Sequence, residues 1–168
     1  MQRRTLLKLG IGSAVVLAIA GGAVSMIQPG LVNGKLSDGG KLVLKRAAQA
    51  ILAGTLPTDA TAQEASLQAF LLRADSFIGS LPDPVQAELS QLFSLLPTAA
   101  GRLGIVGLSA SWEAATVAET TAALQGMRVS GVSLKQQAYL GLHDIVCVPY
   151  FSGEESWKVL GYPGPLAV

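Results

Sequence analysis

Residues 133–148 read SLKQQAYLGLHDIVCV, and their pattern decides the predicted fold. In helical form this stretch has two apolar faces. The first face carries Leu134, Ala138, Leu142, Ile145 and Pro149, and the second carries Tyr139, His143, Val146, Cys147 and Tyr150. A helix that is apolar nearly all round needs cover on all sides, and a small domain leaves much of any helix at its surface. We therefore expect this helix either to run through the core or to offer one face to another protein.

The bounds of this helix follow from its flanking residues. Ser133 and Gln136 form a capping-box pattern, which predicts a helix start. Pro149 predicts the end, because proline lacks the N–H that a helix interior needs. Helical spacing of apolar residues also predicts helices over 41–53, 62–81 and 83–96, and the high alanine content of 109–125 predicts a further helix there. The prediction is an all-α fold, a small bundle of four to five short helices.

The remaining segments complete the predicted domain organisation. Residues 1–28 are expected to be an export signal or membrane anchor helix ahead of the bundle. Residues 29–40 are expected to be a linker, because Pro29-Gly30, Asn33-Gly34 and Asp38-Gly39-Gly40 are turn signals. Residues 41–168 are expected to form the helical domain, ending in an irregular, aromatic-rich C-terminal tail.

Composition excludes several classes of protein. The chain has 168 residues, of which 50% are hydrophobic and 14% charged, against roughly 25% charged in an ordinary soluble domain. This is too apolar for a disordered chain, and it lacks the basic stripe of a nucleic-acid binder. One cysteine and one histidine exclude an intrachain disulfide, a c-type haem site and a cysteine-ligated zinc site within the chain.

The N-terminus carries an export pattern. It reads Gln2-Arg3-Arg4-Thr5-Leu6-Leu7-Lys8 and is followed by 19 uncharged residues, 9–27. The pattern resembles a twin-arginine signal, an address that directs folded cargo through the twin-arginine translocase, and Arg3, Arg4, Leu6, Leu7 and Lys8 are its signal residues. We expect a periplasmic protein whose signal is either removed after the A-x-A-like residues 18–20 or retained as an inner-membrane anchor. The rest of the chain has nine basic and eleven acidic residues, which gives a net charge of −2.

The sequence offers little evidence of catalytic chemistry. His143 and Cys147 are one helical turn apart, but a metal site would need further ligands, and a packed histidine beside a buried thiol is favoured. Gly107 to Ser111 matches the G-x-S-x-G nucleophile pattern only in part. A small hydrolase using Ser109 and His143 therefore remains a third hypothesis. We expect no catalytic, cofactor-binding or metal site in this chain.

The C-terminal segment is rich in aromatic residues, which suit interface anchors. It contains Tyr150, Phe151, Trp157 and Tyr162, among prolines and glycines. The predicted partner interface consists of Tyr139, His143, Tyr150, Phe151, Trp157, Tyr162 and Pro163.

The ending Tyr-Phe-Ser-Gly…Ser-Trp…Gly-Tyr-Pro-Gly-Pro over 150–165 resembles the gluconate 2-dehydrogenase subunit 3 family. The resemblance implies a small helical subunit without its own cofactor. Such a subunit binds, stabilises and co-exports a glucose-methanol-choline (GMC)-type catalytic subunit that holds FAD and oxidises a sugar or alcohol. A cytochrome c subunit, when present, accepts the electrons. The alternative is a stand-alone, membrane-anchored periplasmic helical binding module.

Replacing Arg3 and Arg4 together by lysine is expected to leave the chain in the cytoplasm, because the translocase receptor reads the arginine pair. Cell fractionation followed by immunoblotting measures this. The control is Arg46→Lys, which changes an arginine outside the signal. Unaltered export of the double variant would contradict the twin-arginine assignment.

Overall fold

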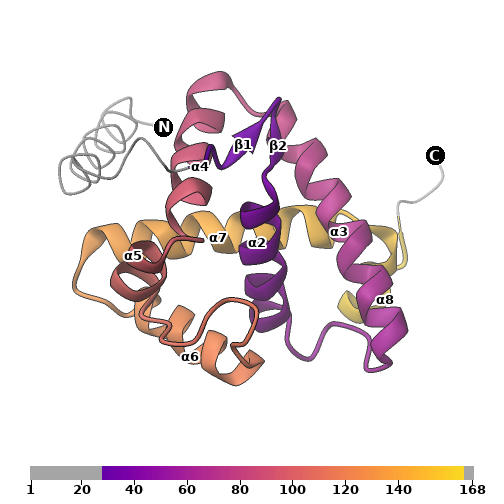
Figure 1. Cartoon of the computed structure of the whole chain (residues 1–168). Coiled ribbons are helices and arrows are strands. Elements are labelled where there is room, and N and C mark those ends of the chain that lie inside the picture. The colour runs from indigo at the N-terminus through magenta and orange to yellow at the C-terminus, as the bar shows by residue number, and fades with distance from the viewer. Residues whose placement is uncertain (1–27, 165–168) are drawn as a thin grey trace.

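The computed structural model describes residues 28–164 and has a mostly helical fold (Figure 1), which confirms the all-α prediction. The predicted signal or anchor comprises residues 1–28, and all of it except residue 28 lies outside the described residues. The helices are α2 (Asp38–Ile51), α3 (Ala60–Ser80), α4 (Asp83–Leu95), α5 (Ala99–Gly101), the π-helical turn η2 (Arg102–Val106), α6 (Val117–Arg128), α7 (Ser133–Phe151) and α8 (Glu154–Leu160). A short hairpin of β1 (Leu31–Val32) and β2 (Lys35–Leu36) precedes them.

Helix α2 lies at the centre of the bundle and contacts α3, α4, α6 and α7 (Figure 1). Its Val43, Leu44, Ala47 and Ala48 have no exposed surface. Two alanines in succession let neighbouring helices approach the α2 backbone closely, while the valine and leucine fill the space beside them. Helix α7 runs behind α2 in this view, so it shares the core with α2 rather than forming its centre alone.

Residues 29–40, predicted to be a linker, are instead part of the folded domain. Asn33 and Gly34 both have positive φ, 52° and 74°, as a tight two-residue hairpin turn requires. Ser37 then caps α2, its side chain accepting a hydrogen bond from the Gly40 amide at 3.2 Å. The predicted turn at 38–40 is therefore the first turn of a helix.

The segment before α6 also differs from the prediction, which had a helix over 109–125. Helix α6 begins only after Thr116, whose side chain and that of Glu119 form a capping box. Upstream, the Trp112 indole is buried and donates to the carbonyl of Leu96 at 2.9 Å. The Arg102 guanidinium binds the carbonyls of Leu108 and Ala110, each at 2.6 Å. These tertiary contacts override the helical preference of the alanine-rich sequence.

The C-terminal part of the fold is more helical than expected. Helix α7 starts at Ser133 without the predicted capping box, because no side chain caps its first turn. It passes through Pro149 and ends at Phe151. The tail then forms α8 over Glu154–Leu160. Glu154 and Glu155 lie in its first turn, where their negative charges interact favourably with the positive end of the helix dipole. The predicted irregular tail is thus irregular only after this helix.

Two glycines provide a matched test of the packing. An added Cβ at Gly30 would overlap the carbonyl oxygen of Ser90 and lie 2.6 Å from the carbonyl carbon of Phe93, whereas one at Gly126 in α6 would meet open space. We expect Gly30→Ala to lower the free energy of unfolding by about 2 kcal/mol or more. Gly126→Ala should raise it by roughly 0.5–1 kcal/mol, since alanine favours a helix. Urea unfolding followed by circular dichroism measures both, and equal effects would contradict this packing.

Candidate interaction site

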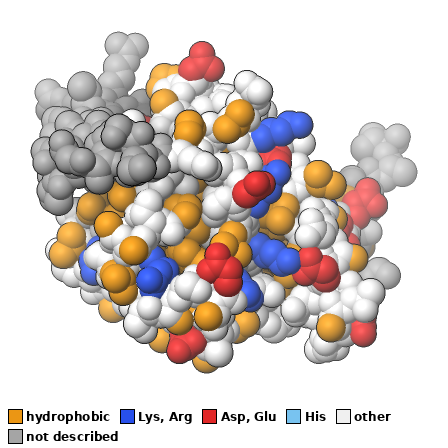
Figure 2. Space-filling view, in the orientation of Figure 1, with side chains coloured by type: hydrophobic (Ala, Val, Ile, Leu, Met, Phe, Trp, Pro, Cys, Tyr) orange, Lys and Arg blue, Asp and Glu red, His pale blue; other side chains and the backbone are white. Residues whose placement is uncertain are grey.

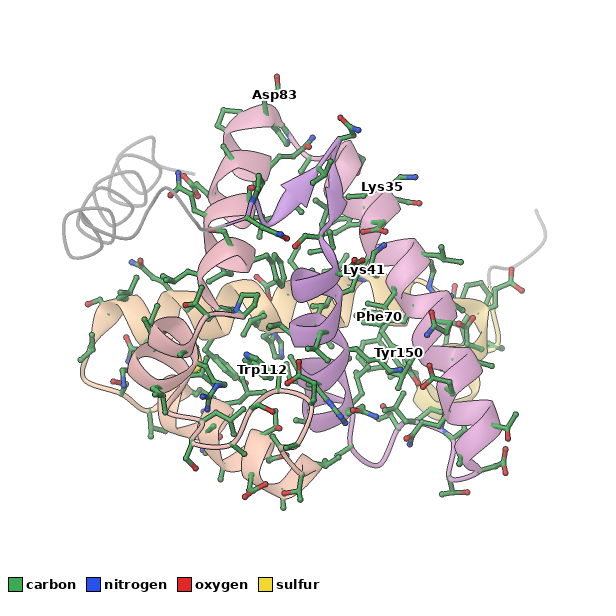
Figure 3. All side chains as sticks on the ribbon, viewed as in Figure 1. Lys35, Lys41, Phe70, Asp83, Trp112 and Tyr150 are labelled. Carbon is green, nitrogen blue, oxygen red and sulfur yellow. The ribbon has the colours of Figure 1, made fainter. Side chains whose placement is uncertain are left out.

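Tyr150 belongs to the domain's own core rather than to a partner interface. Its side chain is 2% exposed and lies between Phe70 of α3, at a ring-centroid distance of 6.4 Å, and Phe151, at 5.2 Å. Its hydroxyl donates to the carbonyl of Thr55 at 3.2 Å. Figure 3 shows Phe70 and Tyr150 close together in the region between α2 and α3. The prediction that Tyr150 faces a partner is therefore wrong, because α3 and the loop after α2 already cover it.

Tyr139, His143 and Cys147 lie one turn apart along α7, and each is half-buried. The rings of Tyr139 and His143 are 5.8 Å apart, tilted by 36°. His143 Nε2 is 3.5 Å from Cys147 Sγ, and its Nδ1 is 3.3 Å from Asp144 Oδ1. Within residues 28–164, no group of three or more His, Cys, Asp or Glu side chains is placed to hold a metal ion.

The Cys147 thiol is shielded by its surroundings. Burial raises the pKa of this thiol above its ordinary value, and the negative charge of Asp144 raises it further. A raised pKa leaves less of the reactive thiolate at neutral pH. The local arrangement therefore suits a packed, unreactive cysteine. The ring of His143 contacts Tyr139, Asp144 and Cys147. Ser109, the other residue of the hydrolase hypothesis, is exposed in the loop after η2.

The last described residues form an aromatic pair at the surface. Trp157 of α8 is half-buried and meets Tyr162 edge to face at 5.3 Å, while the Tyr162 amide donates to the Trp157 carbonyl at 2.9 Å. Tyr162 is 48% exposed, and Pro163 beside it is also exposed. Val159 and Leu160 are more than half exposed. We call Trp157, Val159, Leu160, Tyr162 and Pro163 the C-terminal apolar edge.

Arg73 of α3 holds α8 against the bundle. Its Nε donates to the Pro149 carbonyl at 2.9 Å, and its Nη2 lies 2.6 Å from a carboxylate oxygen of Glu155. Phe151, the remaining aromatic residue of the predicted interface, is half-buried against the core. The C-terminal apolar edge is thus displayed from a helix that is itself fixed to α3 and α7.

A second surface, which the sequence reasoning missed, is an apolar groove of about 370 Å³ between α4 and the first half of α7. We call it the α4–α7 groove. Its apolar lining comprises Val85, Leu89, Leu92, Leu95, Ile105, Leu134, Ala138, Leu140 and Gly141. The polar lining comprises Glu88, Gln91, Gln137 and Asp144. The apolar repeat of 83–96 predicts that one face of this helix is buried. It does not predict that α7 covers only part of that face and leaves a groove.

The molecular surface carries charges of both signs. On the described part of the face in Figure 2, lysine and arginine alternate with aspartate and glutamate among hydrophobic side chains. Several large apolar side chains are exposed over the molecule, including Leu72 at 71% and Val129 at 65%.

Comparisons with known proteins identify no relative: the chain matches no family model, no curated protein and no solved structure. Across residues 28–164, no helix combines the length and the hydropathy needed to cross a bilayer.

The shielding of Cys147 predicts its reactivity. The rate at which iodoacetamide alkylates Cys147 should begin to increase at a higher pH than the rate for a free cysteine. The thiolate is the form that reacts, and the pKa of the Cys147 thiol is raised. Asp144→Asn removes one of the two causes, so the pKa should fall and the rate at pH 8 should increase about twofold. Asp83→Asn is the control, because Asp83 lies at the start of α4, well away from α7 (Figure 3). Equal rates in the two variants would contradict the assigned role of Asp144.

Proposed function

We propose that this chain is the non-catalytic small subunit of a periplasmic dehydrogenase complex. It binds and stabilises an FAD-containing GMC-type catalytic subunit that oxidises a sugar or alcohol, and it carries that subunit through the twin-arginine pathway. The observation that carries the proposal is the Arg3-Arg4 signal pattern at one end of a small helical domain whose other end resembles the gluconate 2-dehydrogenase subunit 3 family. A signal of this type transports folded cargo, so one signal can serve a preassembled pair.

The surface of the domain supports a binding role. Val159, Leu160 and Tyr162 are each about half exposed within four residues of chain, and exposed apolar clusters mark sites of association. Trp157 and Tyr162 are held in a fixed arrangement by their edge-to-face contact and by a backbone hydrogen bond. Aromatic side chains that are ordered before binding lose little entropy in a complex. The C-terminal apolar edge is therefore the surface we assign to the catalytic subunit.

The other predicted interface residues take different roles in this proposal. Tyr150 and Phe151 support the edge from within the domain, whereas Tyr139 and His143, which are half-buried on α7, add to the contact with the catalytic subunit. FAD belongs to the catalytic subunit, and a cytochrome c subunit, when present, accepts its electrons. The twin-arginine translocase is the transient partner of Arg3, Arg4, Leu6, Leu7 and Lys8. After export, the segment that holds these residues is either cleaved or kept as an inner-membrane anchor.

The alternative is a stand-alone, membrane-anchored periplasmic binding module, which the α4–α7 groove favours because it offers an apolar surface independent of any flavoprotein. Affinity purification of the tagged full chain from its native host separates the two. A co-purifying subunit with the absorbance of bound FAD supports the dehydrogenase complex. A colourless, folded protein purified alone supports the module.

Tyr162→Ala is expected to weaken the complex with the catalytic subunit by about 2 kcal/mol, as truncation of an aromatic interface anchor does. This corresponds to a roughly 30-fold higher Kd. Val129→Ala, an equally simple truncation of an exposed apolar residue before α7, is the control and should leave Kd unchanged. Binding is measured by biolayer interferometry, with circular dichroism to check folding. A complex unaffected by Tyr162→Ala would remove the C-terminal apolar edge from the interface.

A further inference from the structure

His143 and Cys147 of α7 form a pair of metal-ligating side chains at the surface of the domain. They lie one helical turn apart, and the Nε2 atom of His143 is 3.5 Å from the Sγ atom of Cys147. A tetrahedral zinc ion with bonds of about 2.05 Å to nitrogen and about 2.3 Å to sulfur holds two such atoms about 3.6 Å apart. The two side chains therefore have the spacing of one edge of a tetrahedral site.

The contacts around His143 leave the nitrogen that faces Cys147 free to bind a metal. The other nitrogen, Nδ1, lies 3.3 Å from a carboxylate oxygen of Asp144. This contact favours the tautomer that carries its proton on Nδ1 and a lone pair on Nε2. A carboxylate in this position is the usual outer partner of a metal-binding histidine. The ring of Tyr139, with its centre 5.8 Å from that of His143, restricts rotation of the imidazole.

One chain supplies only half of the ligands that a structural zinc ion requires. Such sites have four protein ligands, and two cysteines with two histidines are a common set. The whole sequence contains one histidine and one cysteine. Within residues 28–164, no third His, Cys, Asp or Glu side chain is placed to complete a site. A second copy related by a twofold axis brings the same two ligands to the ion and so completes the set.

The side of α7 that carries the pair is open to a second copy. The His143 side chain is 41% exposed, and Cys147 is half-buried. Leu140, three residues before His143, is 55% exposed, and Phe151, four residues after Cys147, is half-buried. Residues at these spacings share one side of a helix. Two copies of α7 that cross at this stripe therefore meet through apolar side chains on either side of the ion.

We propose that His143 and Cys147 bind a zinc ion together with the same residues of a second copy, so that the ion joins two chains through α7. The thiol is protonated in the single chain, and the metal displaces its proton to water as the bond to Sγ forms. Two thiolates then balance the charge of the ion. The inference does not rest on the dehydrogenase proposal, and none of the ligands comes from the C-terminal apolar edge. The second copy and the catalytic subunit compete for His143.

The test is a cobalt titration of the reduced, metal-free full chain, purified in a non-ionic detergent. Tetrahedral cobalt bound to thiolate absorbs visible light, so binding is measured directly. We expect the absorbance to saturate at one cobalt for every two chains and to disappear when zinc displaces the cobalt. An affinity-tagged chain should also retain an untagged chain in the presence of zinc and release it with EDTA. Saturation at one cobalt per chain, absence of the thiolate absorbance, or retention that does not depend on zinc would overturn the proposal.

Variants of α7 make the test specific. Cys147→Ser and His143→Gln each remove one ligand from both copies, so both should abolish the cobalt absorbance and the zinc-dependent retention. Asp144→Asn weakens the outer partner of the histidine and should raise the Kd for zinc about tenfold. Asp83→Asn, at the start of α4, is its control and should leave this Kd unchanged. Circular dichroism checks that the variants fold. Zinc-dependent retention that persists in Cys147→Ser would likewise overturn the proposal.

Discussion

Close packing around α2 is the constraint on which the rest of the structure depends. Val43, Leu44, Ala47 and Ala48 have no exposed surface, and the helices that contact α2 come from both halves of the chain. A larger residue at either alanine would push α6 or α7 outward and disrupt a core that is packed to crystalline density. Helices α3, α4, α6 and α7 keep their positions because they pack on this one helix.

Buried polar contacts then hold the peripheral elements in register. Asp75 of α3 is 9% exposed, and its carboxylate accepts a hydrogen bond from the Leu36 amide at 2.9 Å, with Lys41 Nζ at 3.8 Å. The carboxylate thus joins the hairpin, α2 and α3. A charged acceptor makes a stronger hydrogen bond than a neutral one, which explains how a hairpin of so few residues keeps its place. The same hairpin fixes Gly30 on α4 and so sets where the N-terminal segment meets the domain.

Apolar spacing predicted α3, α4 and most of α7, because their buried residues recur with the helical period. It did not predict the loop before Thr116, where alanine content favours a helix but the burial of Trp112 and the carbonyl contacts of Arg102 prevent one. Asn33-Gly34 is a strong hairpin signal, but the turn residues on both sides of it favour a linker over 29–40. Pro149 predicts a helix end, whereas α7 continues past it to Phe151.

The candidate site was less predictable than the fold. Aromatic content drew attention to the C-terminal segment, but it could not separate Tyr150, which is covered by α3, from Tyr162, which is exposed. The α4–α7 groove depends on which helices become neighbours and on how far apart they lie. Neither quantity is encoded in the periodicity of a single helix, so one sequence without its structure could not reveal the groove.

The contact between Arg73 and Glu155 has a consequence for how the molecule responds to its surroundings. Apolar burial holds α2, α3 and α7 together, and this contribution does not come from pairing of opposite charges. The attachment of α8 relies in part on a half-exposed ion pair, whose strength falls as ionic strength rises. Raised ionic strength therefore weakens this contact of the C-terminal helix, together with the exposed Lys45–Glu64 pair between α2 and α3, whereas the apolar contacts beneath both pairs remain.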